Sequence, residues 1–338
     1  MEYVKHEFPS GTAVKRVLRF TAPAGGNRME NPMKKKILKN IIFALLFIIG
    51  LSILLYPQVS SKWNAYRAKQ LISDYTSAVT QDSDTKEYAE MMKAAQEYNR
   101  GLTWEAVPDA FSVRDGIQDD VYDALLNVDG EGLMGSVEIP AINENIPIYH
   151  YTTEETLQKG AGHLFGSSLP VGGESTHSVL SAHRGLPSAE LFTDLPLLEE
   201  GDVFYYHILG ETLAYEVDQK LTVLPEEVEA LAIEEGKDYS TLVTCTPYGV
   251  NSHRVLVRGH RIPFVEEEYV AEQHKTVKKD TNRLLMHIVC ALIGLALAAV
   301  IVWLINRLDS RKNRKATSPQ EKNGDEGLIS YGEEEKED

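Results

Sequence analysis

Of the two cysteines in this 338-residue chain, Cys245 stands where a thiol could do chemistry. It ends the short apolar run 241–245 and is followed at once by the turn sequence 246–249, so its thiol is expected at the end of a strand. The other cysteine, Cys290, lies within an apolar block, so no disulfide partner or paired zinc ligand accompanies Cys245. Either the thiol is used, or Cys245 is simply a small buried hydrophobe.

An imidazole and a guanidinium occur at two further strand ends. Arg254 opens the apolar run that begins nine residues after Cys245, and a short loop between neighbouring strands would bring the two side chains within reach. His183 ends another apolar run, 179–183. Together they could supply a nucleophile, an acid or base and an oxyanion stabiliser. Arg258 is the rival of Arg254, since alternation puts both on one face of a strand, and Arg254 is preferred as nearer the cysteine loop.

No metal or cofactor is predicted. The other histidines of this region are better interpreted as loop or strand residues than as metal ligands; they are His163, His177, His253 and His260. At pH 7, unperturbed pKa values of ~8.5 for a thiol and ~6.5 for imidazole give about three per cent thiolate and about a quarter imidazolium. Fewer than about one per cent of molecules would then carry the active pair, and coupling between the two groups would raise that fraction.

The segments that position these residues are short apolar runs separated by Gly, Pro and Asn. They predict a mostly β domain of seven or eight strands, as a closed or sandwiched antiparallel sheet. Residues 203–209 and 212–217 are predicted to pair as a hairpin around Gly210. The predicted strands are 133–139, 146–149, 178–182, 203–209, 212–217, 240–245 and 255–262.

Two apolar blocks flank this region. Residues 284–305 would make a helix of ~33 Å, which crosses a hydrocarbon core of ~30 Å and predicts a transmembrane helix. Residues 41–56 would make only ~24 Å and predict a signal-anchor or transmembrane helix over 37–56, or alternatively a cleaved signal peptide, although no Ala-x-Ala site follows. Between the blocks, Tyr88, Met91 and Met92 fall on one stripe of a predicted helix.

These features predict an ordered series of segments. The true start of the chain is expected at Met29 or Met33, ahead of a basic cluster that resembles the opening of an export signal. The predicted segments are a cytoplasmic N-terminal segment 1–36, the anchor 37–56, helices within 57–105, a catalytic domain 131–265, a juxtamembrane linker 266–283, the transmembrane helix 284–305 and a disordered cytoplasmic tail 306–338.

Charge predicts the compartment and excludes one class of partner. The chain has 34 Lys plus Arg against 50 Asp plus Glu, and residues 57–283 alone carry 18 against 38. An acidic domain repels phosphate backbones, which argues against a nucleic-acid partner. Basic residues at 34–39 and 307–315 place both ends in the cytoplasm and the acidic domain outside, although the basic residues within 275–283 weaken this assignment.

Two motifs resemble those of the sortases, specifically the class C, pilus-building branch. They are Leu180-Ser181-Ala182-His183-Arg184-Gly185 and the stretch from Thr241 to Arg254, Thr-Leu-Val-Thr-Cys-Thr-Pro-Tyr-Gly-Val-Asn-Ser-His-Arg. Residues 157–164 and 171–178 also resemble that branch, and the likeness covers about 133–262. A C-terminal membrane span in addition to the N-terminal one is characteristic of the same class.

The resemblance implies an eight-stranded sortase-type β-barrel and a transpeptidation at the cell membrane of a Gram-positive bacterium, with the catalytic domain extracellular. It implies that Cys245 attacks the Thr carbonyl of an LPxTG-like sorting signal, that His183 protonates the leaving amine, and that Arg254 holds the oxyanion. The thioacyl intermediate would be resolved by a Lys amine of the next pilin subunit.

The class also has a lid in front of the barrel, in which an Asp-Pro-aromatic sequence covers the active site. The matching segment lies within 106–130, where Asp109 and Phe111 fit the pattern and Ala110 replaces the expected Pro. Without that Pro the backbone is less restricted, so a looser lid is expected.

The sequence is also compatible with other functions. A degenerate barrel could bind a sorting signal as a scaffold without chemistry, and a sortase-like hydrolase would use water in place of the amine. An unrelated cysteine peptidase is disfavoured, because no Cys-Gly-Ser-Cys-Trp-like signature surrounds Cys245. All three catalytic positions are filled, which favours the enzyme.

Overall fold

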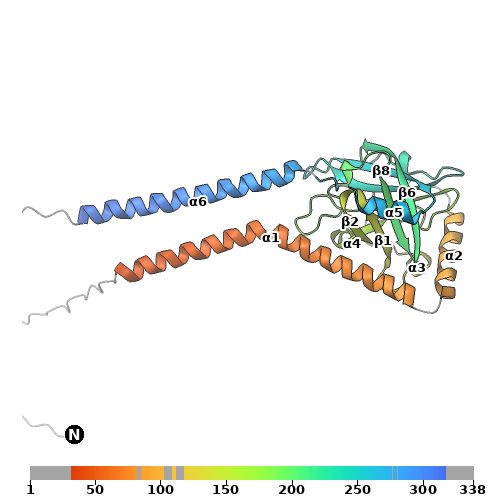
Figure 1. Cartoon of the computed structure of the whole chain (residues 1–338), viewed down its shortest axis with the longest axis horizontal. Coiled ribbons are helices and arrows are strands. Elements are labelled where there is room, and N and C mark those ends of the chain that lie inside the picture. The colour runs from red at the N-terminus through yellow and green to blue at the C-terminus, as the bar shows by residue number, and fades with distance from the viewer. Residues whose placement is uncertain are drawn as a thin grey trace, which may run out of the picture. The chain divides into compact units, whose positions relative to one another are not determined.

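Eight strands form a closed barrel, and Figure 1 shows it with helices on its outside. The computed structural model describes residues 32–81, 85–102, 109–111, 118–275, 277–279 and 281–316. The strands are β1 (Leu133–Ile139), β2 (Glu144–His150), β3 (Ala161–His163), β4 (Thr176–Ser181), β5 (Val203–Ile208), β6 (Glu211–Val223), β7 (Asp238–Thr246) and β8 (His253–Ile262). The helices are α1 (Pro32–Gln81), α2 (Thr85–Gly101), α3 (Asp120–Ala124), α4 (Glu154–Lys159), α5 (Glu266–Gln273) and α6 (Thr281–Ala316).

The barrel is mixed, so the expectation of a purely antiparallel sheet is wrong. Around the barrel the order is β1, β2, β3, β4, β7, β8, β6, β5, with β5 closing onto β1. β2 pairs with β3 in parallel, and so does β4 with β7. Parallel neighbours need a crossover connection. Here α4 lies between β2 and β3, and the chain between β4 and β7 contains the β5–β6 hairpin, which pairs as predicted.

One strand escaped the sequence analysis. β3 has only three residues, too few to show an alternating pattern, and its centre is Gly162. A Cβ atom at Gly162 would lie 2.3 Å from the backbone oxygen of Tyr151, so the close approach of the chain requires glycine here. β6 is also longer than predicted, because it continues past its buried half to pair with β8 as far as Val223.

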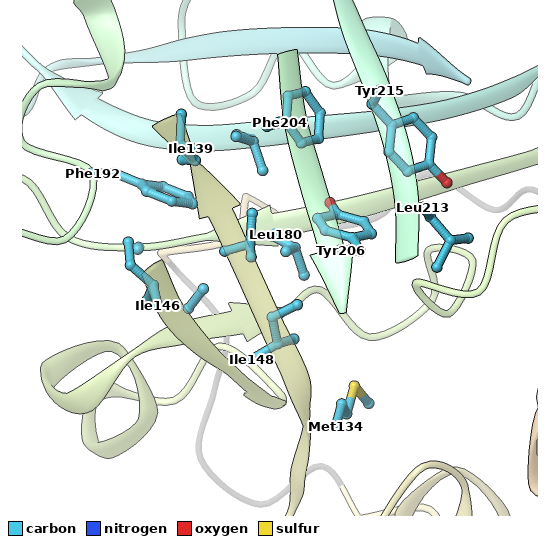
Figure 2. Close-up of a cluster of buried hydrophobic side chains, with 14 of the residues drawn as sticks. Met134, Ile139, Ile146, Ile148, Leu180, Phe192, Phe204, Tyr206, Leu213 and Tyr215 are labelled. Carbon is cyan, nitrogen blue, oxygen red and sulfur yellow. The ribbon is translucent and has the colours of Figure 1, made fainter. Parts of the chain in front are cut away.

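The barrel interior is the main core. Alternate residues of the strands point inward, and Figure 2 shows labelled side chains of β1, β2, β4, β5 and β6 meeting there. Two aromatic rings, Phe204 and Tyr215, stack with centroids 5.5 Å apart. The fully buried members of this core include Met134, Ile139, Ile148, Leu180, Phe192, Phe204, Tyr206 and Tyr215. Packing in this interior buries only the inward-facing side chains of each strand.

The outer faces of β4, β7 and β8 are covered as well, which explains their nearly unbroken apolar runs. Val179, Val243 and Leu256 form a second buried cluster on that face with Leu231 and Ala110. Leu231 belongs to the β6–β7 connection, and Ala110 to the segment before α3. Strands that are buried on both faces lose the polar half of their alternation. The outer face of these three strands is therefore a covered apolar groove.

The helices differ from the predicted segments at their ends. α1 runs without a break through Pro57, so the predicted boundary at residue 56 is not a break in the helix. The chain divides into two units, Met1–Ile53 and Leu54–Asp338. The second contains the barrel and the last part of α1, where the Tyr75 hydroxyl donates to the backbone oxygen of Met134. The stripe on α2 packs against the barrel core through Tyr88, Met91, Met92 and Ala95, as expected of an amphipathic helix.

The C-terminal segments also contain more helix than predicted. The linker 266–283 holds α5, and α6 continues to Ala316, well into the predicted tail. Among the described residues, one helical stretch is long and apolar enough to cross a membrane, Asn40–Thr80, and the apolar part of α6, Val289–Ile305, is shorter. The second membrane span stays a prediction. The expected start at Met29 and the remainder of the tail lie outside the described residues.

Two buried histidines make the fold sensitive to acid. His163 lies between the Tyr122 hydroxyl (2.8 Å) and the backbone oxygen of Ser168 (2.8 Å). His177 lies between the backbone oxygen of Ala232 (2.8 Å) and Thr241 Oγ1 (2.7 Å). Burial lowers the pKa of each to about 4, from 6.5. As the pH falls from about 6.5 to about 4, these two imidazoles therefore become protonated in the unfolded chain while they stay neutral in the folded one.

We expect preferential protonation of the unfolded chain at each of these histidines to lower the free energy of unfolding by about 3 kcal/mol between pH 7 and pH 4. The melting temperature, followed by circular dichroism between pH 7 and pH 4.5, measures this loss. His177→Gln should flatten the profile, because it removes one of the two buried imidazoles. An unchanged slope in His177→Gln would contradict the assignment.

Candidate active site

Cys245 and Arg254 are direct neighbours across β7 and β8. In the antiparallel register, Cys245 pairs with Arg254, and Val243 pairs with Leu256 two residues along. Residues two apart on a strand share a face, so Cys245 and Arg254 lie on the covered outer face with Val243 and Leu256. Both are nearly buried, at 6% and 9% exposed. The pairing that the sequence suggested is thus present at the end of the groove.

His183 reaches the same end from β4. The parallel register pairs Ser181 with Val243, and it is prolonged by a bond from the backbone N–H of Ala182 to the oxygen of Val243 (3.2 Å). Thr244 Oγ1 then donates to the backbone oxygen of Ala182 (2.8 Å). Continued two residues beyond Ser181, this register places His183 beside Cys245. The structure therefore brings all three predicted catalytic residues to one rim of the barrel.

The segment 109–111 closes over this rim. Asp109 accepts two hydrogen bonds from Arg254, at 2.7 Å from Nε and 2.7 Å from Nη2. The ring of Phe111 lies 5.0 Å from the Arg254 guanidinium and 5.8 Å from the His183 ring. Ala110 is buried in the groove itself at 3% exposed. The looser lid expected from the missing Pro is not seen at these residues, because a bidentate ion pair and two ring contacts fix them. The flanking residues 107, 108 and 112 lie outside the described chain.

The closed segment governs the electrostatics of the thiol. Burial raises the pKa of Cys245, the neighbouring Arg254 lowers it, and Asp109 raises it. The net direction is upward, so the thiol is held protonated while the segment is closed. The donor groups of Arg254 are also occupied. Its Nη1 donates to the backbone oxygens of Asn251 (3.0 Å) and His253 (3.1 Å), and its Nε and Nη2 donate to Asp109.

We expect Asp109→Ala to make Cys245 more reactive. Removing the carboxylate takes away a charge that raises the thiol pKa and releases the cover that buries it. Both effects favour the thiolate, so the pH midpoint of alkylation by iodoacetamide should fall and the rate at pH 7 should rise several-fold. Intact-mass measurements over time report the rate. Asp218→Ala, which breaks the equivalent ion pair of Arg258, is the matched control and should leave the rate unchanged.

Arg258, the rival candidate, lies elsewhere. It pairs with Thr241 across β7, donates to Asp218 at 3.0 and 3.2 Å, and stacks on the Tyr239 ring at 4.1 Å. It therefore shares the face of Arg254 but is four residue pairs away from Cys245 along the β7–β8 ladder. Among the described residues, no group of His, Cys, Asp or Glu is arranged to hold a metal ion.

One acidic residue at the site was missed by the sequence analysis. Glu154, the first residue of α4, places its Oε2 3.4 Å from His183 Nε2. That nitrogen is buried and makes no hydrogen bond to any of the residues that the structure describes. Glu154 belongs to a helix of only six residues and precedes His183 by 29 positions, so no sequence spacing links the two. Only the lateral order of β2, β3 and β4, in which β2 and β3 are parallel and β3 and β4 antiparallel, brings α4 beside the end of β4.

Comparison with known proteins agrees with this geometry. Residues 137–262 match the family model described as the Sortase domain. Sortase A of Bacillus anthracis is 25% identical over 227 residues, which is 67% of this chain and 96% of that protein. The crystal structure of Streptococcus pneumoniae Sortase C is 47% identical with a TM-score of 0.56, covering 58% of this chain and 98% of that one. Sortase C-1 of Actinomyces oris is 44% identical with a TM-score of 0.51, covering 53% and 99%.

The barrel and these relatives define a cysteine transpeptidase. The chain belongs to the sortase family, and its structural neighbours place it in the class C branch.

Proposed function

We propose that this sortase cleaves an LPxTG-like sorting signal and joins its Thr carbonyl to a Lys amine of a pilin subunit. The observation that carries the proposal is the pairing of Cys245 with Arg254 at a rim that His183 also reaches. It supplies a nucleophile, an oxyanion donor and a proton carrier at one point. The covered apolar groove beside them provides a binding surface for an extended peptide, since it is lined by Val179, Val243 and Leu256.

The reaction proceeds in two halves. The thiolate of Cys245 attacks the Thr carbonyl, Arg254 stabilises the oxyanion, and His183 protonates the departing Gly amine as the C–N bond breaks. The acceptor amine then attacks the thioacyl carbon, loses its proton to His183, and releases the Cys245 thiolate. Both halves need Arg254 free of Asp109, so the segment 109–111 must leave the rim before a signal peptide binds.

The pilin assignment is supported by the relatives. The structure of Streptococcus pneumoniae Sortase C is described in terms of catalysis and pilin substrate specificity. A Lys of a pilin as acceptor would give a covalent polymer. The apolar first part of the stretch Asn40–Thr80 would hold the barrel at the outer face of the membrane, where such substrates are displayed, while its last turns pack on the barrel.

Mass spectrometry of the ectodomain with an LPxTG-type peptide and an amine tests this function. We expect an acyl adduct on Cys245 and a ligated product whose mass is that of the acyl fragment plus the amine. Peptide bound but left intact would overturn the proposal in favour of a scaffold. Free acid as the sole product, even at high amine concentration, would make the protein a hydrolase.

A further inference from the structure

The carboxylate beside His183 has no part in the chemistry above, although its position is well defined. Glu154 Oε1 accepts a hydrogen bond from Gln158 Nε2 (2.9 Å) one turn along α4, and Oε2 lies 3.4 Å from His183 Nε2. Thr153 caps the helix, and the buried Thr156 and Leu157 fix it to the barrel. The Glu154 side chain is nevertheless 67% exposed. A fixed negative charge is therefore presented to solvent at the catalytic imidazole.

The second half of the reaction makes a demand that Glu154 meets. A Lys amine has a pKa of ~10.4, so nearly every acceptor arrives as a cation and must lose a proton before its nitrogen can attack. A carboxylate attracts that cation and orients it through a charge-assisted hydrogen bond. Arg254 and Phe111 at the rim do not offer this attraction, because one is cationic and the other apolar. The Asp109 carboxylate is engaged by Arg254 and lies on the segment that must leave the rim.

Space for an approaching chain lies next to α4. A cavity of about 890 Å³ lies between α4, the connection after β4 and the barrel-side part of α1, and it is lined by Gln158, Lys159 and Leu191. Gln158 is the residue that holds Glu154. The cavity thus begins one helical turn from the carboxylate. It is separate from the apolar groove, whose cover is Ala110 and Leu231.

We propose that Glu154 is the acceptor-binding residue, which receives the Lys ammonium of the incoming protein and delivers it to His183. The inference rests on the proposed function and deepens it. The ammonium releases one proton to water at the exposed carboxylate. The neutral nitrogen attacks the thioacyl carbon, the new N–C bond forms as the C–S bond breaks, and the second nitrogen proton passes to His183. Cys245 leaves as a thiolate beside imidazolium, which is the pair that the first half requires.

Two nucleophiles tested on preformed acyl-enzyme at pH 7.5 separate this role from mere support of His183. A Lys-containing peptide is cationic at that pH and hydroxylamine is neutral. We expect Glu154→Gln to lower the second-order rate constant for the peptide roughly tenfold. The rate with hydroxylamine, and the rate of acylation by the signal peptide, should each stay within about twofold of the unmodified protein.

Neighbouring substitutions provide the controls. Glu155→Gln removes an equally acidic residue that pairs with Lys159 instead, and should change neither rate. Glu154→Asp keeps the charge and should recover part of the loss. Equal losses with both nucleophiles, or slower acylation, would show that Glu154 only positions His183 and would overturn the inference, as would an unchanged rate with the peptide. If the unmodified protein formed no acyl adduct on Cys245, the proposed function itself would fail.

Discussion

Replacing Cys245 with Ala should abolish formation of both the acyl adduct and the ligated product. The thiol is the only nucleophile placed opposite Arg254 in the β7–β8 register, and alanine leaves His183 and Arg254 with no atom to activate. Removing the nucleophile of a comparable catalytic unit costs about 10⁶-fold in rate, so turnover should fall below detection. Release of the Gly-containing fragment, followed by chromatography with mass detection, measures the loss.

The expected loss must come from chemistry and not from unfolding. The change removes one buried sulfur from a strand end, so the melting temperature and the far-ultraviolet spectrum should be close to those of the unmodified protein. Cys290→Ala, at the other cysteine, should keep full activity because that residue lies in α6 and is exposed. Appreciable ligation by Cys245→Ala would mean that another group carries the acyl chain.

Arg254→Ala should lower kcat for transpeptidation by about 10² to 10³, the effect of removing one oxyanion donor. The argument comes from position, since Arg254 is the sole guanidinium paired with Cys245 in the register. Arg254→Lys should recover little, because a lysine keeps the charge but lacks the planar fork that can reach the oxyanion while holding neighbouring backbone oxygens. Steady-state kinetics with a quenched LPxTG-type peptide measure both variants.

Arg258→Ala is the control that the two candidate arginines provide. Arg258 holds Asp218 through two hydrogen bonds and stacks on Tyr239, so its loss should lower the melting temperature. Its kcat should stay within a few-fold of normal, since it pairs with Thr241 and not with the thiol. If instead Arg258→Ala lost activity and Arg254→Ala kept it, the assignment of the oxyanion donor would be wrong.

Local sequence was sufficient to predict that Cys245 and Arg254 lie close together. Cys245 and Arg254 lie nine residues apart on two strands joined by a short turn, and such strands usually pair with each other, so their proximity was expected from chain connectivity. His183 ends an apolar run of its own, and its motif connected it with the other two. The hairpin of β5 and β6 was predictable for the same reason, because Gly210 sits between two alternating runs.

Contacts between distant segments were beyond the reach of sequence patterns. The parallel pairing of β4 with β7 and the three-residue β3 depend on barrel closure, which no local period encodes. The bond between Asp109 and Arg254 joins residues 145 positions apart, and the sequence suggested a loose cover where the structure has a fixed one.

The sequence by itself determined which groups are candidates for the chemistry, because nucleophile, acid and oxyanion donor are properties of side-chain type and of strand ends. The tertiary structure decided the state of those groups. Burial of the thiol, occupation of Arg254 by Asp109, and the carboxylate of Glu154 at His183 all arise where separate segments meet, and solvation and charge at such a meeting depend on distance in space and not on distance along the chain.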